Sequence, residues 1–299
     1  MATRCAWSGR RAAMTGKAQI AWMPDGRRLH LHHGPIDMIV SIEGPERKAG
    51  FARAARRFET LLEELVAELP LLRSPPGAVV AGEAAQKMAA ATRPFAPRFI
   101  TPMAAVAGAG ADTILAAVCA GPGIDRAYVN NGGDVALHIG PGQRMTAANP
   151  AAPLTRIVLC HADRPRGVAT SGWRGRSHSL GIADAVTVLA ATAAAADAAA
   201  TMICNAVDLP GHPAIARIPA HDLFPDSDLG PRPVTAAVGP LTPAEVSRAL
   251  DAGAAFARNC LDRGLIHAAL LSLQGRERHI ATFPYLQPKE YLHARLHPA

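Results

Sequence analysis

The chain has 299 residues, 49% of them hydrophobic and 4% aromatic, and a chain of this length buries about three-quarters of its unfolded surface. Its 31 Lys and Arg residues outnumber 24 Asp and Glu residues, but they are scattered without interleaved aromatic side chains, which argues against a nucleic-acid partner and favours an anionic small molecule. The absence of a long apolar stretch argues against membrane insertion and export, and five widely spaced cysteines without a C-x-x-C pair indicate reduced thiols in the cytoplasm.

The first 120 residues predict three strands followed by three helices. Alternating segments around an Asp25-Gly26 turn predict the strands, and a 3.6-residue apolar period predicts the first helix. The predicted strands are 18–23, 28–33 and 36–42, and the predicted helices are 45–68, 81–92 and 102–119. Thr101 is the expected N-cap of the third helix, and the glycines at 108 and 110 inside it indicate that another element or a ligand approaches closely there.

The middle of the chain predicts a hairpin and an alanine-rich helix. An Asn-Asn-Gly-Gly-Asp tip between two apolar runs predicts a hairpin over 128–137, followed by an irregular loop over 140–153 and a strand over 156–160. A small-residue turn is expected at residues 170–172 and a strand at 185–189. Thr192 is the expected N-cap of a helix over 193–202.

The last third begins with a proline-rich segment, 206–233, which is either a functional flap or a disordered excursion. A strand over 234–238, a helix over 243–263 with a capping box of Thr242 and Glu245, and a hairpin over 266–283 follow. Hairpin-built sheets with helices packed on one side define an α+β fold. We expect one domain over 1–299, which divides into two interlocked halves at about 17–120 and 121–285.

Asp197 and Thr201 are the sharpest candidates for a site. They lie at i and i+4 of the alanine-rich helix, so their oxygens share one face, and carboxylate and hydroxyl oxygens suit Mg²⁺. The alternative is that Asp197 only caps or pairs locally. His178 follows Arg174 and Arg176 after the small-residue turn, and it is a candidate for contacting a phosphate or for acid–base catalysis; the alternative is a structural histidine.

The ordered motifs resemble the ApbE family, Mg²⁺-dependent flavin transferases that bind FAD and attach FMN to other proteins. The resemblance rests on Gly-Gly-Asp at 132–134, Ala-Thr-Ser-Gly at 169–172, His178, and Ala-Asp-Ala-x-Ala-Thr ending at Thr201. The chain is more similar still to an ApbE-like branch without an assigned function, which shares LHHGPIDMIVSIEG, FITPMAAVAGAGAD and VNNGGDVAL. The resemblance covers residues 34–201 well.

The resemblance implies a site of three parts. Asp197 and Thr201 are the implied metal ligands, with a backbone carbonyl from residues 104–108, and His178 is the implied catalytic residue. The implied cofactor-binding residues are Asp112, Asn131, Gly132, Gly133, Asp134, Thr170, Ser171 and Gly172.

The sequence also departs from the flavin transferases. Ala107 stands where the family has a Lys, so one cationic phosphate contact is missing, and the loop after His178 is shortened. We therefore expect a protein that binds FAD, FMN or a similar phosphorylated heterocycle, with FMN transfer or FAD pyrophosphate cleavage as its activity. The alternatives are a non-catalytic flavin- or pterin-binding module and an enzyme of another cofactor or one-carbon pathway. The sequence leaves open whether the protein is a homo-oligomer.

Overall fold

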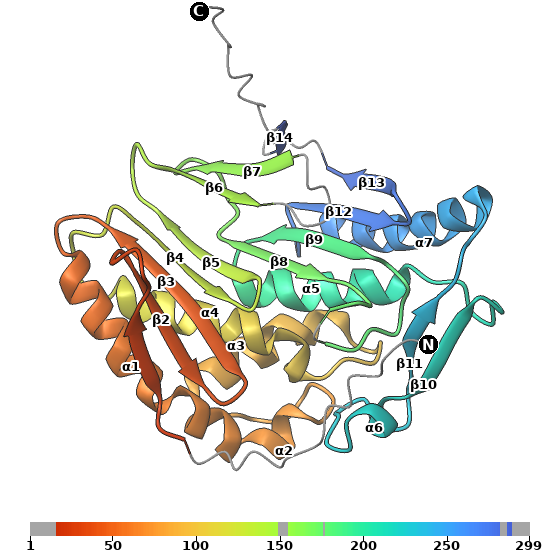
Figure 1. Ribbon diagram of the computed structural model, residues 1–299, viewed down its shortest axis with the longest axis horizontal. Helices are drawn as coiled ribbons and strands as arrows, with labels where there is room; N and C mark the ends of the chain where they lie inside the picture. Colours follow the sequence, from red (N-terminus) through yellow and green to blue (C-terminus); the bar gives the residue numbers. More distant parts are fainter. Residues whose placement is uncertain (1–15, 149–154, 176, 282–285, 289–299) are drawn as a thin grey trace, which may run out of the picture.

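A nine-stranded antiparallel sheet is the centre of the computed structural model, which describes residues 16–148, 155–175, 177–281 and 286–288 (Figure 1). Its strand order is β1-β2-β3-β4-β5-β8-β9-β12-β13, and β3 pairs with β4, which joins the two predicted halves of the chain. The predicted α+β class is confirmed. The strands are β1 Gln19–Trp22, β2 Arg28–His33, β3 Ile36–Glu43, β4 Arg126–Asn131, β5 Asp134–Ile139, β8 Gly167–Ser171, β9 Ala185–Ala190, β12 Ala268–Leu273 and β13 Arg276–Ile280.

Helices cover one face of this sheet. α1, α4 and α5 contact β3, β4 and β8 in turn, and α7 contacts β12 and β13 (Figure 1). The predicted apolar period of the first helix is confirmed, because Phe51, Phe58, Leu62 and Leu65 are all buried. The helices are α1 Arg47–Ala67, α2 Leu69–Leu72, α3 Glu83–Thr92, α4 Val106–Val118, α5 Ala193–Ala206, α6 Ala220–Leu223 and α7 Pro243–Asp262, with 3₁₀ turns η1 Arg93–Phe95 and η2 Pro102–Ala105. In the described part of the chain, none of the helices has the length and apolar character needed to cross a bilayer.

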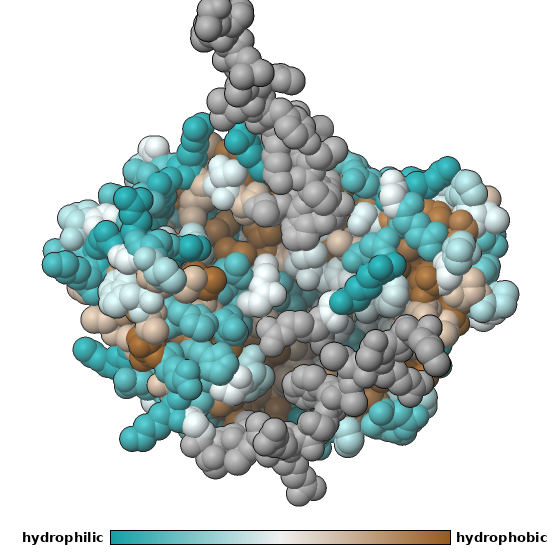
Figure 2. All heavy atoms as spheres, in the orientation of Figure 1, coloured by the Kyte–Doolittle hydropathy of each residue, from teal (hydrophilic) through white to brown (hydrophobic). Residues whose placement is uncertain are grey.

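A small sheet packs on the opposite face of the large one. It has the order β14-β7-β6, with β6 Arg144–Ala148, β7 Thr155–Cys160 and β14 Leu286–Pro288. Ile157 and Leu159 of β7 form a second apolar cluster with Leu137, Val168 and Leu189 of the large sheet. Figure 2 shows apolar side chains near β5 and β6, and another group near α7, among mostly hydrophilic side chains. A separate pair, β10 Ile215–Pro219 and β11 Pro233–Val238, lies beside α6.

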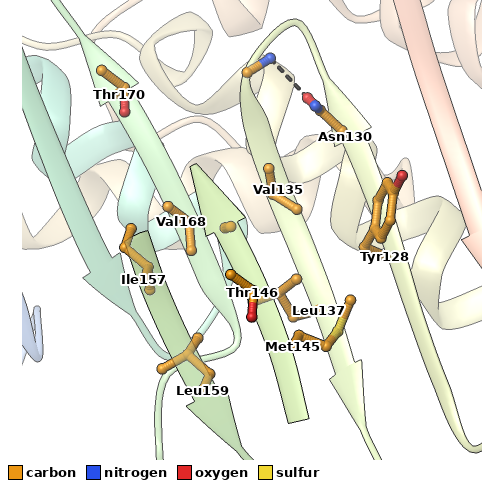
Figure 3. Close-up of a pocket in the computed structure, with 12 residues that line it drawn as sticks. Tyr128, Asn130, Val135, Leu137, Met145, Thr146, Ile157, Leu159, Val168 and Thr170 are labelled. Atoms are coloured by element: carbon orange, nitrogen blue, oxygen red, sulfur yellow. Dashed lines mark hydrogen bonds between the residues drawn. The ribbon is translucent and has the colours of Figure 1, made fainter. Parts of the chain in front are cut away.

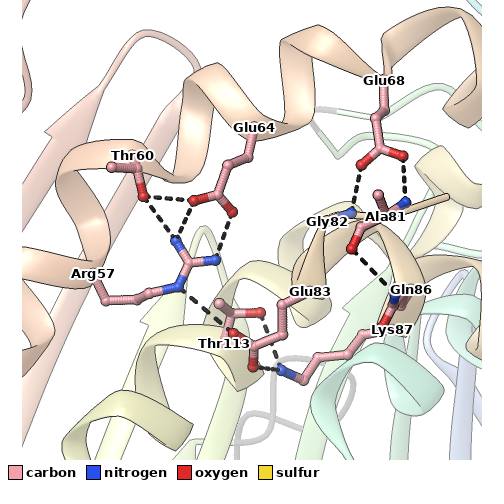
Figure 4. A network of polar contacts seen from close by, with 10 residues as sticks. All are labelled: Arg57, Thr60, Glu64, Glu68, Ala81, Gly82, Glu83, Gln86, Lys87 and Thr113. Atoms are coloured by element: carbon pink, nitrogen blue, oxygen red, sulfur yellow. Dashed lines mark hydrogen bonds and ion pairs between the residues drawn. The ribbon is translucent and has the colours of Figure 1, made fainter.

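A polar network ties α1, α3 and α4 together (Figure 4). Glu68, just after α1, accepts hydrogen bonds from the N–H groups of Ala81 and Gly82, both at 2.7 Å, and so fixes the entry to α3. Lys87 of α3 pairs with Glu83 and lies 3.4 Å from the hydroxyl of Thr113 in α4. The segment between α1 and α3, which carries Arg73, is therefore anchored at both ends.

Three predictions about local structure are wrong. The expected irregular loop over 140–153 contains strand β6, and residues 149–153 of it lie outside the described residues. Residues 170 and 171 of the expected turn at 170–172 are instead the end of strand β8. The small residues of this strand hide the alternation of its side chains. Gly167, at its start, packs against the backbone of Thr192, where a Cβ has no room. Thr101 makes no cap bond, because its hydroxyl is hydrogen-bonded to Asp228 instead.

The proline-rich segment is ordered, so the disordered alternative is wrong and the functional flap stays a prediction. It contains β10 and α6 between residues 206 and 233, and pairing with β11 organises it. The helix caps at Thr192 and Thr242 are confirmed, and the second is a complete capping box with Glu245. Gly132 and Gly133 have φ values of 64° and 117°, which confirms the positive-φ hairpin tip.

Gly108 is the point of closest approach between α4 and α5. A Cβ at this position would lie 2.3 Å from the carbonyl oxygen of Ala193 and 2.7 Å from the nitrogen of Ala194. At Gly110 a Cβ would meet Met38 at 3.0 Å and Asn131 at 3.3 Å. Helix and strand packing therefore account for both glycines.

Replacement of Gly108 by alanine tests this contact. Gly108→Ala should lower the free energy of unfolding by about 2–3 kcal/mol, because the rigid backbone of α5 must move to admit the methyl group. Gly16→Ala, where a Cβ has no neighbour within 4 Å, is the control and should change stability by less than about 0.5 kcal/mol. Urea unfolding of both variants measures the difference, and equal stabilities would contradict the close packing.

Candidate functional site

A cavity of about 400 Å³ lies where α4, α5, the tip of the β4–β5 hairpin and the 224–229 loop meet. It brings together Asp134, His178, Asp197 and Thr201, four of the residues that the sequence proposed. Ala104 and Ala107, from the segment expected to offer a backbone carbonyl, line the same cavity. Because α4 and α5 pack against each other, residues from segments far apart in the sequence line the same cavity.

Asp197 and Asp112 each accept hydrogen bonds from backbone N–H groups near the start of the opposite helix. Asp197 on α5 accepts a hydrogen bond from the N–H of Gly108 at 3.0 Å, in the first turn of α4. Asp112 on α4 accepts from the N–H groups of Ala193 at 3.0 Å and Ala194 at 2.9 Å, which begin α5. Each carboxylate thus satisfies backbone donors at the start of the other helix, where negative charge is favoured. Both oxygens of Asp112 are engaged in this way, whereas Asp197 also borders the cavity.

Asp134 faces Asp197 across the cavity. The register that pairs Asn131 with Asp134 across the Gly132-Gly133 tip points both side chains toward the helices. The amide of Asn131 donates to the carbonyl of Ala107 at 3.0 Å, and the N–H of Thr170 donates to Asp134 at 3.3 Å. The hairpin tip is therefore fixed to the start of α4 on one side and to β8 on the other.

The two facing carboxyls resist ionisation. Burial raises the pKa of Asp134 to about 7, against the opposing effect of the Thr170 N–H. Burial also raises the pKa of Asp197 well above its usual range, and the neighbouring Asp134 raises it further. A bound cation would lower the free-energy cost of ionising these two buried acids.

Asp197 and Thr201 present two side-chain oxygens to the cavity. Thr201 borders the cavity one helical turn after Asp197, as the spacing predicted. Among the described residues, no group of three or more His, Cys, Asp or Glu side chains could hold a metal by itself. A hard ion here would therefore combine Asp197 and Thr201 with backbone carbonyls, water or a ligand, which is how proteins usually bind Mg²⁺.

His178 is held over the cavity by a tightly anchored loop. Gly181 packs against the end of α5, where a Cβ would lie 2.0 Å from the carbonyl oxygen of Cys204, and the N–H of Leu180 donates to Asn205 at 2.9 Å. The imidazole lies 5.2 Å from the ring of Phe224, centroid to centroid. Within the described part of the chain, its buried Nε2 has no hydrogen-bond partner. The nitrogen is therefore a buried polar atom whose hydrogen-bonding capacity is unsatisfied in the described residues.

The remaining predicted residues lie around this cavity or behind the sheet. Gly133 and Thr170 line a second cavity on the opposite sheet face, and the Thr170 hydroxyl bonds Thr187 at 2.9 Å. Gly132 supplies the positive φ of the tip, Ser171 ends β8, and Gly172 packs on the carbonyl of Asp184. The alternation of side chains along a strand divides these neighbours between two faces.

Sequence reasoning missed several residues of the cavity wall. Arg73 comes from the segment before α3, and Phe224, Asp226 and Asp228 come from the loop after α6. Asp228 is tied to Thr101 by a hydrogen bond, so the loop is attached to the start of η2. The acids of the proline-rich segment were visible in the sequence, but only long-range pairing shows which of them reach the site.

Replacement of Asp134 by asparagine tests the raised pKa. A folded-state pKa near 7, above the ordinary 3.8, means that the folded protein loses stability from this group as the pH rises from about 4 to about 7. Asp134→Asn keeps an oxygen for the Thr170 N–H and removes the charge. In EDTA the variant should be more stable than the wild type by about 4 kcal/mol at pH 8 and by about 2 kcal/mol at pH 5, since one pKa unit corresponds to about 1.4 kcal/mol.

Urea unfolding at the two pH values provides this comparison. Asp262→Asn, on an exposed residue at the end of α7, is the matched control and should change stability little at either pH. A stabilisation by Asp134→Asn that is equal at pH 5 and pH 8 would show that the carboxyl is ionised normally.

Comparisons with known proteins assign the family. The chain is 35% identical over 178 residues to the UPF0280 protein MK0206 of Methanopyrus kandleri, covering 56% of this chain and 69% of that one. It is 37% identical over 123 residues to a UPF0280 protein of Methanoculleus marisnigri, covering 40% of this chain and half of that relative's length. The apo flavinyl transferase ApbE of Pseudomonas stutzeri superposes with a TM-score of 0.46 at 13% identity, over 89% of this chain and 96% of that one. A family model described as AbpE bacteria matches residues 20–279, and the chain therefore belongs to this ApbE-like family.

Proposed function

We propose that the protein binds FAD together with Mg²⁺ in the cavity beside α4 and α5, and that it cleaves the pyrophosphate or transfers the FMN half. The observation that carries the proposal is the facing pair of buried carboxyls, Asp134 and Asp197, beside Thr201. The ApbE-like motifs that supply these residues support a flavin nucleotide as the ligand.

Asp197 and Thr201 would hold the metal. A divalent cation supplies charge neutralisation and polarises a phosphoryl oxygen when it is bound. It would also relieve the repulsion between Asp134 and Asp197, which favours their ionised forms. The carboxylate of Asp197 is already oriented by the Gly108 N–H, so its position does not depend on the ligand.

The proposed reaction is a displacement at the phosphorus of the FMN half. A water molecule or a protein hydroxyl forms the new P–O bond, the bond to the bridging oxygen breaks, and AMP leaves with the electron pair. His178 is the acid–base candidate, because its Nε2 has no partner in the described residues and its ring borders the cavity. The Phe224 ring fixes the imidazole from one side.

Arg73 is our candidate for the cationic phosphate contact that Ala107 does not provide. It is the one arginine or lysine among the described residues that line the cavity. Its segment is anchored by Glu68 at the end of α1, which keeps it beside the cavity mouth. A guanidinium makes paired hydrogen bonds to phosphate oxygens, so it can take over the role of the family lysine.

Replacement of Asp197 by asparagine tests the metal and nucleotide site. Asp197→Asn keeps the size and an acceptor oxygen but removes the charge, so Mg²⁺-dependent FAD binding should weaken by about 100-fold or more. Isothermal titration of FAD with Mg²⁺ and with EDTA measures this, and Asp262→Asn should behave as the wild type. Binding that is equally tight with and without Mg²⁺ would contradict the metal assignment.

Product analysis of the same mixtures separates the alternatives. AMP and FMN, or AMP and flavinylated protein, would identify an enzyme, whereas tight binding without products would identify a binding module. Failure to bind FAD or FMN under any condition would favour an enzyme of another cofactor pathway that uses the same cavity.

Replacement of Arg73 by glutamine tests the phosphate contact. Arg73→Gln should weaken FAD binding by about tenfold and leave riboflavin binding unchanged, because riboflavin has no phosphate. Arg27→Gln, at an exposed turn position, is the control for the loss of one positive charge. Equal losses for FAD and riboflavin would assign Arg73 a structural role.

A further inference from the structure

A third cavity, of about 660 Å³, lies between α7, the end of α5 and the turn that follows α3. None of its described lining residues borders the cavity of Asp197. Ala206, which lines it at the end of α5, lies about 14 Å along the helix axis from Asp197, at a rise of about 1.5 Å per residue. No step of the proposed reaction uses this space.

Two arginines determine the charge of this cavity. Arg98 and Arg263 both line it, and its described lining residues include no Asp or Glu. Both guanidiniums act on the Cys260 thiol, where their charges oppose the effect of burial, which raises the pKa of that thiol to about 11. By contrast, the second cavity, between the large sheet and the small one, has no charged side chain among its described lining residues (Figure 3). The third cavity therefore presents two neighbouring positive charges to a ligand.

Both guanidiniums are held in place and keep free N–H groups. Cζ of Arg98 lies 4.5 Å from the centroid of the Phe256 ring, and a guanidinium stacked on a ring still has its N–H edge for other partners. Arg263 donates through Nη2 to the carbonyl of Pro94, which leaves the donors on Nε and Nη1. Within the described part of the chain, neither side chain makes another hydrogen bond or an ion pair. Asn259 lies one helical turn before Arg263 on the same face of α7 and adds an amide donor.

These donors suit a phosphate monoester better than a carboxylate. A phosphate monoester carries about −1.5 to −2 charges near pH 7, which two guanidiniums neutralise, and its three terminal oxygens accept from separate donors. One guanidinium satisfies both oxygens of a carboxylate, so the second would have no partner. The rest of the cavity is apolar, because the small side chains of Ala252 and Ala255 leave room beside Phe256. Its volume lies in the range of small-molecule sites, about 300–1,000 Å³.

We propose that this cavity is a second binding site, for a small phosphate monoester with an apolar body. The phosphate accepts hydrogen bonds from Arg98, Arg263 and Asn259. The apolar body lies on Ala252 and Ala255 of α7. The site shares no described residue with the cavity proposed for FAD, so it does not depend on the proposed function.

Isothermal titration with 1-naphthyl phosphate in EDTA tests the proposal, with 1-naphthoate and 1-naphthol as its carboxylate and uncharged analogues. We expect one saturable site per chain, which binds the phosphate at least tenfold more tightly than either analogue. Arg98→Gln and Arg263→Gln should each weaken binding of the phosphate about tenfold, because each removes one cation and its paired donors. Arg98→Lys keeps the charge without the paired donors and should give an intermediate loss.

Two controls locate the binding. Arg258→Gln removes the same charge from an exposed position of α7 outside the cavity and should bind as the wild type does. Asp197→Asn should also bind normally, which separates this site from the FAD cavity, and melting temperatures show that each variant is folded. The proposal is wrong if no saturable binding occurs, if either analogue binds as tightly as the phosphate, or if Arg258→Gln loses as much affinity as folded Arg98→Gln and Arg263→Gln.

Discussion

The close contact between α4 and α5 is the constraint on which the site depends. Gly108 lets the two helices approach until the backbone of one touches the other, and the buried alanines of α5 keep its surface low enough for that approach. Asp112 and Asp197 then satisfy the first N–H groups of the opposite helix. Without such partners, helix starts buried at this depth would leave unsatisfied donors. The same geometry that stabilises the contact therefore places one carboxylate, Asp197, at the edge of a cavity.

Local features of the sequence were enough to predict the elements that local interactions determine. The caps at Thr192 and Thr242, the glycine tip at residues 132–133 and the apolar period of α1 each involve residues within a few positions of one another. Strands β6 and β8 were missed because their small residues hide the alternation of side chains. Likewise, Thr101 looks like a cap from its neighbours, but a contact 127 residues away, with Asp228, decides its role.

The candidate site was predictable to the extent that its residues share an element. Helical spacing alone places Asp197 and Thr201 on one face, and both border the cavity. The motif residues on strands were harder to place, because adjacent residues such as Gly133 and Asp134 border different cavities. Arg73 and Phe224 carry no motif and come from segments joined to the site only by tertiary contacts. Spacing along one helix therefore predicted that Asp197 and Thr201 lie together, whereas the other residues that line the cavity could not be predicted from it.

The charges around the cavity support the proposal that a metal binds together with the ligand. Among the described residues, four carboxyl groups border the space, those of Asp134, Asp197, Asp226 and Asp228, together with the guanidinium of Arg73 and the imidazole of His178. A pyrophosphate would be repelled by this set, and the net charge of +7 over the whole chain does not help, because solvent and salt screen distant charges within about 10 Å. Without a cation, Asp134 and Asp197 are least destabilised when they are protonated. A Mg²⁺ ion bound with the nucleotide would instead neutralise the charge of their ionised forms. It follows that metal and nucleotide should each strengthen the binding of the other, since a coupling free energy between two ligands is reciprocal.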